Sequence, residues 1–308
     1  MSAFQSEEQV IIETIVVEQE QQELSNRGGF LNGCVKGLGK GQDFVAFGKE
    51  NEFDWGVLLD GHGGDKFINM MRLEDWRAIM ISENPWEKLL TILRTFPFSY
   101  CVNSGSTLLM MRVYANRVET LSVGDSGLVI YKNGVLVYKS TEHNSENAGE
   151  VERLKSRKVI INKMNAPVVC IASAKNLKTK FKDYITFEDG TIIAPTQALG
   201  HCNVTRYAPE VHIETFEPDD EMRCVLFSDG FGDMFLFESD VEEDKLQDER
   251  DILTMTADEL IEKAEARWRQ EWNLYNDASK PDVFQNGKFP LDGMDDVGIV
   301  VWDNKKKV

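Results

Sequence analysis

The stretch "GVLLDGHGGDKF", residues 56–67, constrains the fold and the chemistry of this chain more than any other. Residues 57–59 form a short apolar run bounded by glycine, which is typical of a buried strand. Asp60 ends that run, and burying a carboxylate there costs free energy unless something positive meets it. The stretch therefore predicts a strand whose end needs a positive partner, with His62 held beside it among glycines.

Four more acids accompany predicted strands. Asp43 opens "DFVAF", Asp125 lies in the turn "VGDSG", Asp229 ends "VLFSD" and Asp295 stands just before "DVGIVVW". Any one of them is best interpreted as a turn residue or a helix cap, but five in one chain favour a shared site. Carboxylates that converge repel each other by several kcal/mol in a low-dielectric site, and a divalent cation relieves that repulsion. A ligand set of oxygens indicates Mg²⁺ or Mn²⁺ rather than zinc.

The glycine-rich turn adds two candidates. Gly61 has no side chain, so its backbone carbonyl can approach a metal closely. An isolated loop histidine is usually structural, but beside a carboxylate cluster His62 is a candidate general acid. The nearby "CVKGLGKGQD" is no phosphate-binding Walker A loop, because Gly39-Lys40 is followed by Gly41 rather than Ser or Thr. An NTPase is therefore disfavoured.

The bulk composition excludes several classes of function. The net charge of −18 over 308 residues argues against nucleic acid or an anionic membrane as a partner. No apolar run approaches the roughly 18 residues of a membrane span. The five cysteines, which are Cys34, Cys101, Cys170, Cys202 and Cys224, form no CxxC pair, and the N-terminus lacks a basic signal segment. Together these features predict a soluble protein of a reducing compartment, the cytoplasm or the nucleus.

The pattern of expected strands and helices along the chain predicts one domain. Residues 1–27 are expected to be an N-terminal arm or an extra strand, and residues 28–304 the domain itself. Expected elements are a hairpin with its turn at residues 49–52, a second hairpin at Asn133-Gly134, and a helix from Thr256 whose apolar face runs on to Tyr275. Strands grouped with helices inserted between the groups favour an α+β layered fold over strict βαβ alternation.

Eight segments resemble, in order, the motifs of the metal-dependent Ser/Thr protein phosphatases of type 2C. They are "GQDFVAFG", similar to the first acidic motif; "DGHGG", the best-known signature; "SGSTLLMMRV"; "SVGDSGLVIYKNG", similar to a Gly-Asp-Ser-Arg motif and its hairpin; "STEHNSENAGEVERL"; "TQALGH", similar to Arg-Ala-Leu-Gly-Asp; "VLFSDGFGDM"; and "DDVGIVV". Each string is weakly specific, but their order from about Gly33 to Trp302 makes the resemblance strong.

The resemblance implies a four-layer α-β-β-α sandwich, in which two packed antiparallel sheets are flanked by helices. It implies two Mg²⁺ or Mn²⁺ ions and a weaker third site, with the ligands Asp43, Asp60, Gly61, Asp229, Asp295 and Asp125. Asp60 would bridge the two ions, and Asp125 with Asp229 would form the third site. His62 matches the proposed general acid. A variable flap is expected within residues 160–200, and a monomer is the default state.

Four positions depart from the family pattern. Leu38 stands where the family usually has an arginine that holds the substrate phosphate, so Lys40 is the expected phosphate-binding residue. Lysine gives a point charge rather than a bidentate fork. Gln42, Gly127 and His201 replace a common Glu, an Arg and an Asp respectively. These changes leave the main metal ligands in place.

The leading hypothesis is hydrolysis of phosphoserine and phosphothreonine in proteins by a metal-activated water. The alternative is a pseudophosphatase, a binding or scaffold module that keeps the fold; the missing arginine favours it and the retained acids oppose it. A metal-dependent hydrolase of small phosphorylated molecules stays open, and a comparison of phosphopeptide with metabolite substrates would separate it.

Overall fold

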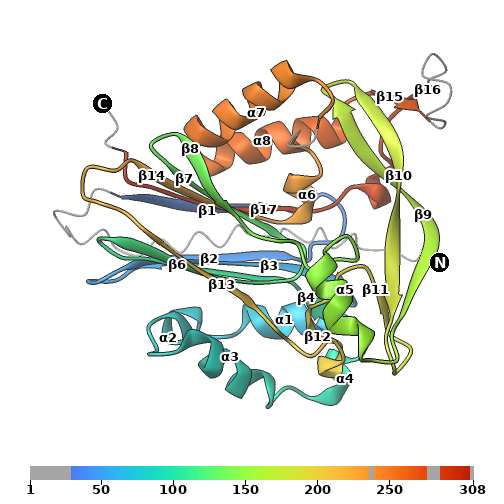
Figure 1. Cartoon of the computed structure of the whole chain (residues 1–308), viewed down its shortest axis with the longest axis horizontal. Helices are drawn as coiled ribbons and strands as arrows, with labels where there is room; N and C mark the ends of the chain where they lie inside the picture. The colour runs from blue at the N-terminus through green and yellow to red at the C-terminus, as the bar shows by residue number, and fades with distance from the viewer. Residues whose placement is uncertain (1–28, 236–238, 276–284, 306–308) are drawn as a thin grey trace, which may run out of the picture.

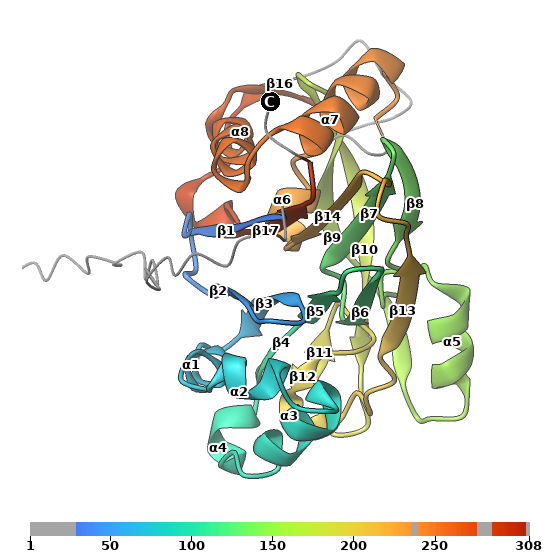
Figure 2. The same ribbon diagram turned by 90° about the vertical axis from the view of Figure 1, so that its left-hand side faces the viewer.

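The chain folds into layers around two packed β-sheets. The structure, a computed structural model, describes residues 29–235, 239–275 and 285–305 (Figure 1). Within these residues, two antiparallel sheets pack face to face and helices cover their outer faces, as the side view in Figure 2 shows. The predicted four-layer α+β sandwich is confirmed. The predicted N-terminal arm, residues 1–27, lies outside the described residues, and the domain boundary at residue 28 stays a prediction.

The first sheet contains the strand that precedes Asp229 and the strand that follows Asp295. In spatial order it consists of β1 (Phe30–Lys36), β17 (Val297–Asp303), β14 (Met222–Phe227), β7 (Gly127–Lys132) and β8 (Val135–Lys139). The predicted Asn133-Gly134 turn joins β7 to β8, and both of its residues have positive φ. The buried centre of this sheet is β17 and β14, whose residues are all buried.

The second sheet contains the predicted strand that carries Asp60, Gly61 and His62. In spatial order it consists of β12 (Leu199–Gly200), β4 (Ser104–Ser106), β3 (Asp54–Gly63), β5 (Leu108–Val113), β6 (Arg117–Val123) and β13 (Glu210–Thr215), with β2 (Asp43–Lys49) paired to β3. The predicted hairpin is confirmed, because β2 and β3 pair antiparallel on either side of residues 50–53. Residues 55–61 of β3 are buried, as expected for an inner strand.

Three apolar cores separate the layers. Between the sheets, buried side chains such as Leu58, Leu226 and Val300 interdigitate. On the second sheet lie α1 (Lys66–Arg72), α2 (Trp76–Met80), α3 (Pro85–Leu93) and α4 (Phe98–Cys101). On the first sheet lie α6 (Asp229–Gly232), α7 (Glu242–Thr254) and α8 (Ala257–Arg269). No helix among the described residues is long and apolar enough to cross a membrane.

A third, smaller sheet stands at one end of the sandwich (Figure 1). It consists of β9 (Ile160–Ser173), β10 (Asn176–Thr186), β11 (Ile192–Ile193), β15 (Trp272–Tyr275) and β16 (Gln285–Gly287). The antiparallel pair of β9 and β10 is its main feature, and it occupies the segment where the resemblance implied a flap. The helix α5 (Ala148–Lys155) precedes it, and the short helices η1 (His201–Asn203) and η2 (Leu291–Gly293) lie in later connections.

The late helix is shorter than its apolar pattern predicted. Its Thr256–Glu259 capping box is present, but the helix ends at Arg269. Trp272, expected on the helix face, instead begins β15, which pairs with β10. The Trp272 indole N–H donates to the carbonyl of Arg267 at 3.0 Å, so this ring satisfies a helix-terminal acceptor. Apolar spacing alone could not distinguish a cap contact from another helical turn.

Candidate active site

The acids predicted at the strand ends come from both sheets and meet at one end of the sandwich. Asp43 and Asp60 are directly opposite each other in the β2–β3 ladder. Asp229 opens α6 just after β14, and Asp295 stands just before β17. The backbone N–H of Asp229 donates to Oδ2 of Asp60 at 3.4 Å, which links the two sheets at this point. The structure therefore brings together four of the five predicted acids.

Electrostatic repulsion inside this cluster is large. Burial, followed by the neighbouring carboxylates, raises the pKa of Asp60 well above its ordinary value. Burial also raises the pKa of Asp43, and the Ser228 hydroxyl offsets this in part. For Asp295, burial and then Asp229 raise the pKa to about 6, against the opposing effect of Lys40. The cluster therefore resists full ionisation until positive charge is added.

Lys40 forms an ion pair with one of these acids. Its Nζ lies 3.2 Å from both carboxylate oxygens of Asp295. Burial opposes the charged form of this lysine, but Asp295, Asp229 and Asp60 outweigh that effect and raise its pKa. The residue predicted to bind phosphate is thus placed at the acids, where it pairs with one of them.

Asp296 is a buried acid that the sequence analysis did not single out. Its Oδ1 accepts hydrogen bonds from the backbone N–H groups of Leu38 at 2.9 Å and Gly39 at 3.2 Å. Its Oδ2 accepts one from Gln42 at 2.6 Å. The carboxylate therefore fixes the loop that carries Lys40. The signal for it was present in "DDVGIVV", since successive residues of an extended chain point to opposite sides.

His62 has a partner that the sequence did not predict. Its Nδ1 lies 3.1 Å from Nε2 of His201, and the two rings stack with centroids 4.9 Å apart and 15° between their planes. His201 is 2% exposed. Burial, and then repulsion by His62, lowers the pKa of His201 to about 4. His201, a departure from the family pattern, is therefore held neutral beside the candidate acid.

Asp125 lies in the turn between β6 and β7. Burial lowers the pKa of the nearby His143, and Glu150, followed by weaker charges that include Asp125, acts in the opposite direction. The Nδ1 of His143 accepts the backbone N–H of Gly124 at 3.0 Å, which fixes the turn. The pairing of Asp125 with Asp229 in a third metal site stays a prediction.

The donor set fits a hard divalent cation. Oδ2 of Asp43 is buried and has no hydrogen-bond partner among the described residues, so it is a carboxylate oxygen available to an ion. The surrounding acids supply further oxygen ligands of the kind that Mg²⁺ and Mn²⁺ prefer. Among the described residues, no group of three or more His, Cys, Asp and Glu side chains is arranged as it stands to hold a metal ion.

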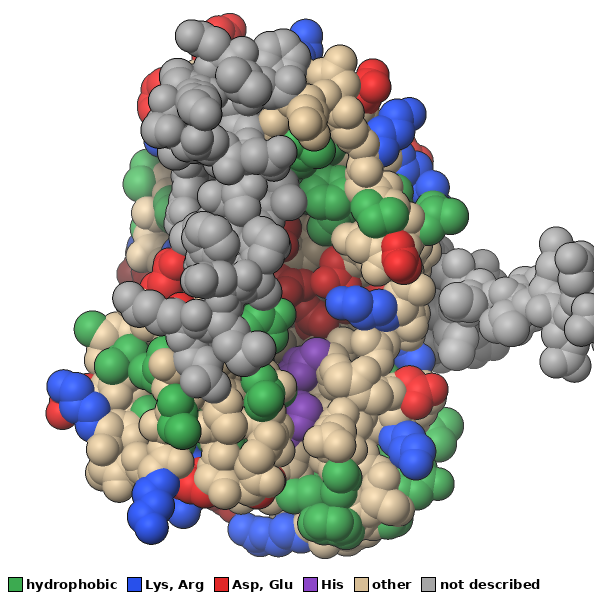
Figure 3. Space-filling view, turned by 90° about the vertical axis from the view of Figure 1, so that its right-hand side faces the viewer, with side chains coloured by type: hydrophobic (Ala, Val, Ile, Leu, Met, Phe, Trp, Pro, Cys, Tyr) green, Lys and Arg blue, Asp and Glu red, His purple; other side chains and the backbone are tan. Residues whose placement is uncertain are grey.

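The surface above the cluster is hollowed. Figure 3 shows acidic side chains at the floor of a recess between the two halves of the molecule, with histidine below them and a basic side chain at the rim. The recess opens toward the end of the sandwich at which the strand-end acids lie.

Comparison with known proteins identifies the family. The sequence profile described as protein phosphatase 2C matches residues 87–270, which is more than half of the chain. The chain belongs to the protein phosphatase 2C family. Among curated protein sequences, none matches it significantly.

Solved structures with a similar fold agree with this assignment. A C. elegans sex-determining protein is 16% identical with a TM-score of 0.55, and the match covers 90% of this chain and 65% of that one. The serine-threonine phosphatase 2C of Toxoplasma gondii is 13% identical with a TM-score of 0.55, over 89% and 94% of the two chains. The S. agalactiae serine/threonine phosphatase is 15% identical with a TM-score of 0.52, over 89% and 98%. At these identities the likeness shows the fold.

Three departures of this chain from the protein phosphatase 2C pattern have structural explanations. Leu38 packs against the apolar core between the first sheet and its helices, so this position does not offer a cation. Gln42 is buried, and its amide donates to the carbonyl of Gly63 at 3.3 Å. A Cβ on Gly127 would lie 2.3 Å from the Phe227 ring, so an arginine there would require the ring to move.

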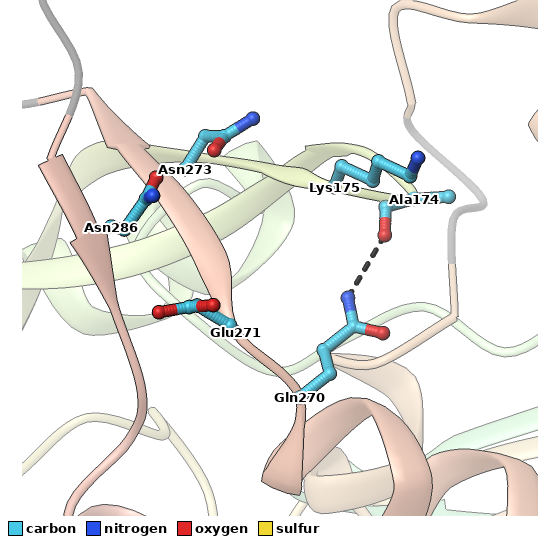
Figure 4. A pocket seen from close by; sticks show the side chains of 6 residues that line it. All are labelled: Ala174, Lys175, Gln270, Glu271, Asn273 and Asn286. Carbon is cyan, nitrogen blue, oxygen red and sulfur yellow. Dashed lines mark hydrogen bonds between the residues drawn. The ribbon is translucent and has the colours of Figure 1, made fainter.

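A separate pocket lies beside the third sheet (Figure 4). Its lining residues are Ala174, Lys175, Gln270, Glu271, Asn273 and Asn286. The Gln270 amide donates to the carbonyl of Ala174 at 2.9 Å, which ties the turn between β9 and β10 to the end of α8. No residue of the candidate site lines it, so the chemistry belongs to the acidic recess.

Proposed function

We propose that this chain is a metal-dependent phosphoprotein phosphatase that hydrolyses phosphoserine and phosphothreonine. The observation that carries the proposal is the cross-sheet acid cluster, in which Asp43 and Asp60 of one sheet face Asp229 and Asp295 of the other. Buried carboxylates with raised pKa values destabilise a fold unless they serve a bound cation. Membership of the protein phosphatase 2C family supplies the reaction class.

The ligand assignment follows the family pattern. Asp60, the carbonyl of Gly61, Asp43, Asp229 and Asp295 would hold Mg²⁺ or Mn²⁺, with Asp60 shared between two ions. Asp125 would contribute with Asp229 to a weaker third site. The unpartnered Oδ2 of Asp43 supports its direct participation.

Two residues of the chain provide proton donation and phosphate binding beside the ions. When bound, the ions supply positive charge for the phosphoryl oxygens and a water of lowered pKa as nucleophile. As the bond between phosphorus and the serine or threonine oxygen breaks, His62 protonates the departing oxygen. Lys40, once Asp295 is engaged elsewhere, holds a phosphoryl oxygen as a point charge in place of the arginine replaced by Leu38.

Phosphate release from a phosphothreonine peptide tests the proposal. Purified protein is assayed with Mn²⁺, with Mg²⁺ and with EDTA, beside Asp60→Asn, Asp229→Asn and the exposed control Asp219→Asn. Metal-dependent turnover that both cluster variants abolish and the control retains is the expected result. Absence of turnover in the unmodified protein, with Mn²⁺ binding intact by calorimetry, would overturn the catalytic proposal for this substrate class. A phosphorylated metabolite in the same assay tests the small-molecule alternative.

The second candidate is a pseudophosphatase that binds a partner without turnover. The observation that favours it is the partly buried Leu38, which packs against the core at the position of the family arginine, together with the absence of a preformed metal-binding group among the described residues. Peptide binding without phosphate release, measured on the same preparation, is its signature.

We further propose that the chain acts on protein substrates as a monomer in the cytoplasm or nucleus. Its charge of −18 and its scattered cysteines suit neither nucleic acid nor an oxidising compartment, and the monomer rests on the family resemblance alone. Light scattering after size exclusion tests the monomer, with a mass near twice that of the chain contradicting it.

A further inference from the structure

The hydrogen bond between His62 and His201 is the strongest feature of the recess that the proposed function leaves unused. It joins β3 to η1 across a sequence separation of 139 residues. The Nδ1 of His62 is engaged by His201, so under the proposed function the proton would leave from the other ring nitrogen, Nε2. A ring held at one nitrogen cannot rotate freely, so the partner determines where the second nitrogen lies.

The chain around His201 adopts unfavourable backbone geometry. His201, Cys202 and Asn203 all have positive φ, at 44°, 51° and 59°. Such conformations are uncommon and unfavourable in residues other than glycine. Three in succession persist only where the surrounding structure imposes them. Here they bring the ring of His201 under that of His62.

A glycine on the neighbouring strand makes room for the ring. Gly105 pairs with His62 in the β3–β4 ladder and with Gly200 in the β4–β12 ladder. A Cβ at Gly105 would lie 2.4 Å from Cδ2 and 2.5 Å from Nε2 of His201. Any larger residue would therefore push His201 away from His62. Strand, turn and ring together form one arrangement.

We propose that His201 is a positioning residue that orients the imidazole of His62 toward the leaving-group oxygen. The proposal rests on the proposed function, since it concerns the same reaction. His201 is buried, and its Nε2 lies 3.1 Å from Nδ1 of His62, so this nitrogen can accept the Nδ1–H of His62. It accomplishes this without adding the negative charge that an aspartate at this position would bring to an already acidic recess.

The test uses two variants that match in length. His201→Gln keeps a hydrogen-bonding group near the Nε2 position, and His201→Met removes it; both residues are unbranched at Cβ, so the positive φ affects them similarly. His212→Gln, on the edge strand β13, is the control. Each folded variant is assayed with a phosphothreonine peptide and with p-nitrophenyl phosphate, whose phenolate leaves without needing a proton.

A positioning role predicts a loss that depends on the leaving group. His201→Met should lower kcat for the phosphopeptide by about 10- to 100-fold, because positioned general acids contribute typically 10²–10⁴-fold. The loss with p-nitrophenyl phosphate should be at least tenfold smaller. His201→Gln should recover much of the phosphopeptide rate. Equal losses on both esters, or no loss, would overturn the proposal, because a structural role does not distinguish leaving groups.

A second measurement is independent of turnover. With ¹⁵N-labelled histidine the chain gives signals from its four histidines, and single substitutions assign them. The Nδ1 signal of His62 should shift in His201→Met and stay near its original position in His201→Gln. An unchanged signal in both variants would overturn the proposal. If the unmodified protein releases phosphate from neither ester, the proposed function fails, and the NMR result decides the orientation of His62 separately.

Discussion

Single buried side chains hold the loop that borders the recess. Asp296, 1% exposed, accepts three backbone N–H groups from the segment that contains Lys40. Hydrogen bonds to an ionised acceptor are about twice as strong as neutral ones, and their loss leaves buried donors unsatisfied. One carboxylate therefore determines both the stability of this loop and the place of its lysine.

Asp296→Asn should lower the free energy of unfolding by about 2–4 kcal/mol. An amide has one acceptor oxygen for a site in which both carboxylate oxygens accept, so at least one backbone N–H loses its partner. Urea denaturation measures the change. The control is Asp292→Asn, an exposed acid nearby in sequence, which should change stability by less than about 0.5 kcal/mol. Equal effects from the two substitutions would contradict this role of Asp296.

The neutral state of His201 predicts a pH dependence. Its folded-state pKa of about 4 lies below the ordinary 6.5, so the unfolded chain binds this proton more strongly. The stability that His201 contributes is therefore complete above pH 6.5 and is lost as the pH falls toward 4, by at most about 3 kcal/mol. Urea denaturation of the unmodified protein and of His201→Gln at pH 7.5, 6 and 4.5 isolates this contribution.

The difference between those two proteins is the informative quantity. Asp43 and Asp60, whose pKa values are raised by burial, act with the opposite sign, since they stabilise the fold at low pH. That effect is common to both proteins and cancels. A free-energy difference that stays constant across the three pH values would contradict the assignment of a low pKa to His201.

At the scale of elements, α7 and α8 are joined by a buried ion network. Asp248 of α7 accepts from both terminal nitrogens of Arg267 of α8, at 2.6 and 2.7 Å. Lys263 of α8 adds a contact of 2.6 Å to the same carboxylate. Arg267 also donates to the carbonyl of Met234, so the network extends to the chain just after α6.

Removing the central acid should destabilise the molecule strongly. Asp248→Ala leaves Arg267, 8% exposed, as a buried charge without this partner, and such losses cost about 3–5 kcal/mol. Thermal and urea unfolding measure it, with Glu243→Gln on the exposed side of α7 as the control. A cost of less than 1 kcal/mol would show that the network contributes little.

The same scale shows what the sequence could and could not predict. The strand of residues 57–59 could be predicted because it is apolar and bounded by glycine. The start of the late helix could be predicted because Thr256 and Glu259 form a capping box from local side-chain chemistry alone. The end of α8 could not be predicted, because Trp272 continues the helical spacing although it belongs to a strand of the third sheet. The four clustered acids were predictable as strand ends, whereas the contact of His62 with His201 depends on a turn with positive φ that no local pattern announces.

At the scale of the whole molecule, the metal-free cluster is expected to be a source of instability. When folding raises the pKa of a carboxylate, the folded state loses stability as the pH rises through that folded-state pKa. At pH 7.5 with EDTA, Asp60→Asn should therefore raise the melting temperature, by roughly 2–4 °C for a chain of this size. Mn²⁺ should raise the melting temperature of the unmodified protein and leave that of Asp60→Asn almost unchanged.

Differential scanning calorimetry with and without Mn²⁺ measures both effects. The exposed Asp219→Asn variant should behave like the unmodified protein in each condition. An Asp60→Asn variant that melts lower than the unmodified protein in EDTA would mean that the acids contribute more through hydrogen bonds than they cost through repulsion.

The two pairs of acids belong to different sheets, and this has a consequence for distant residues. The apolar layer between the sheets, where Leu58 packs and where Gly298 of β17 lies against Asp43 and Leu58, helps to set how one pair lies relative to the other. A change in the thickness of that layer is therefore expected to change the affinity of the site for a divalent ion. Leu58→Val, which shortens a side chain within that layer, should therefore alter the affinity for Mn²⁺ measured by calorimetry, although Leu58 is not among the proposed ligands.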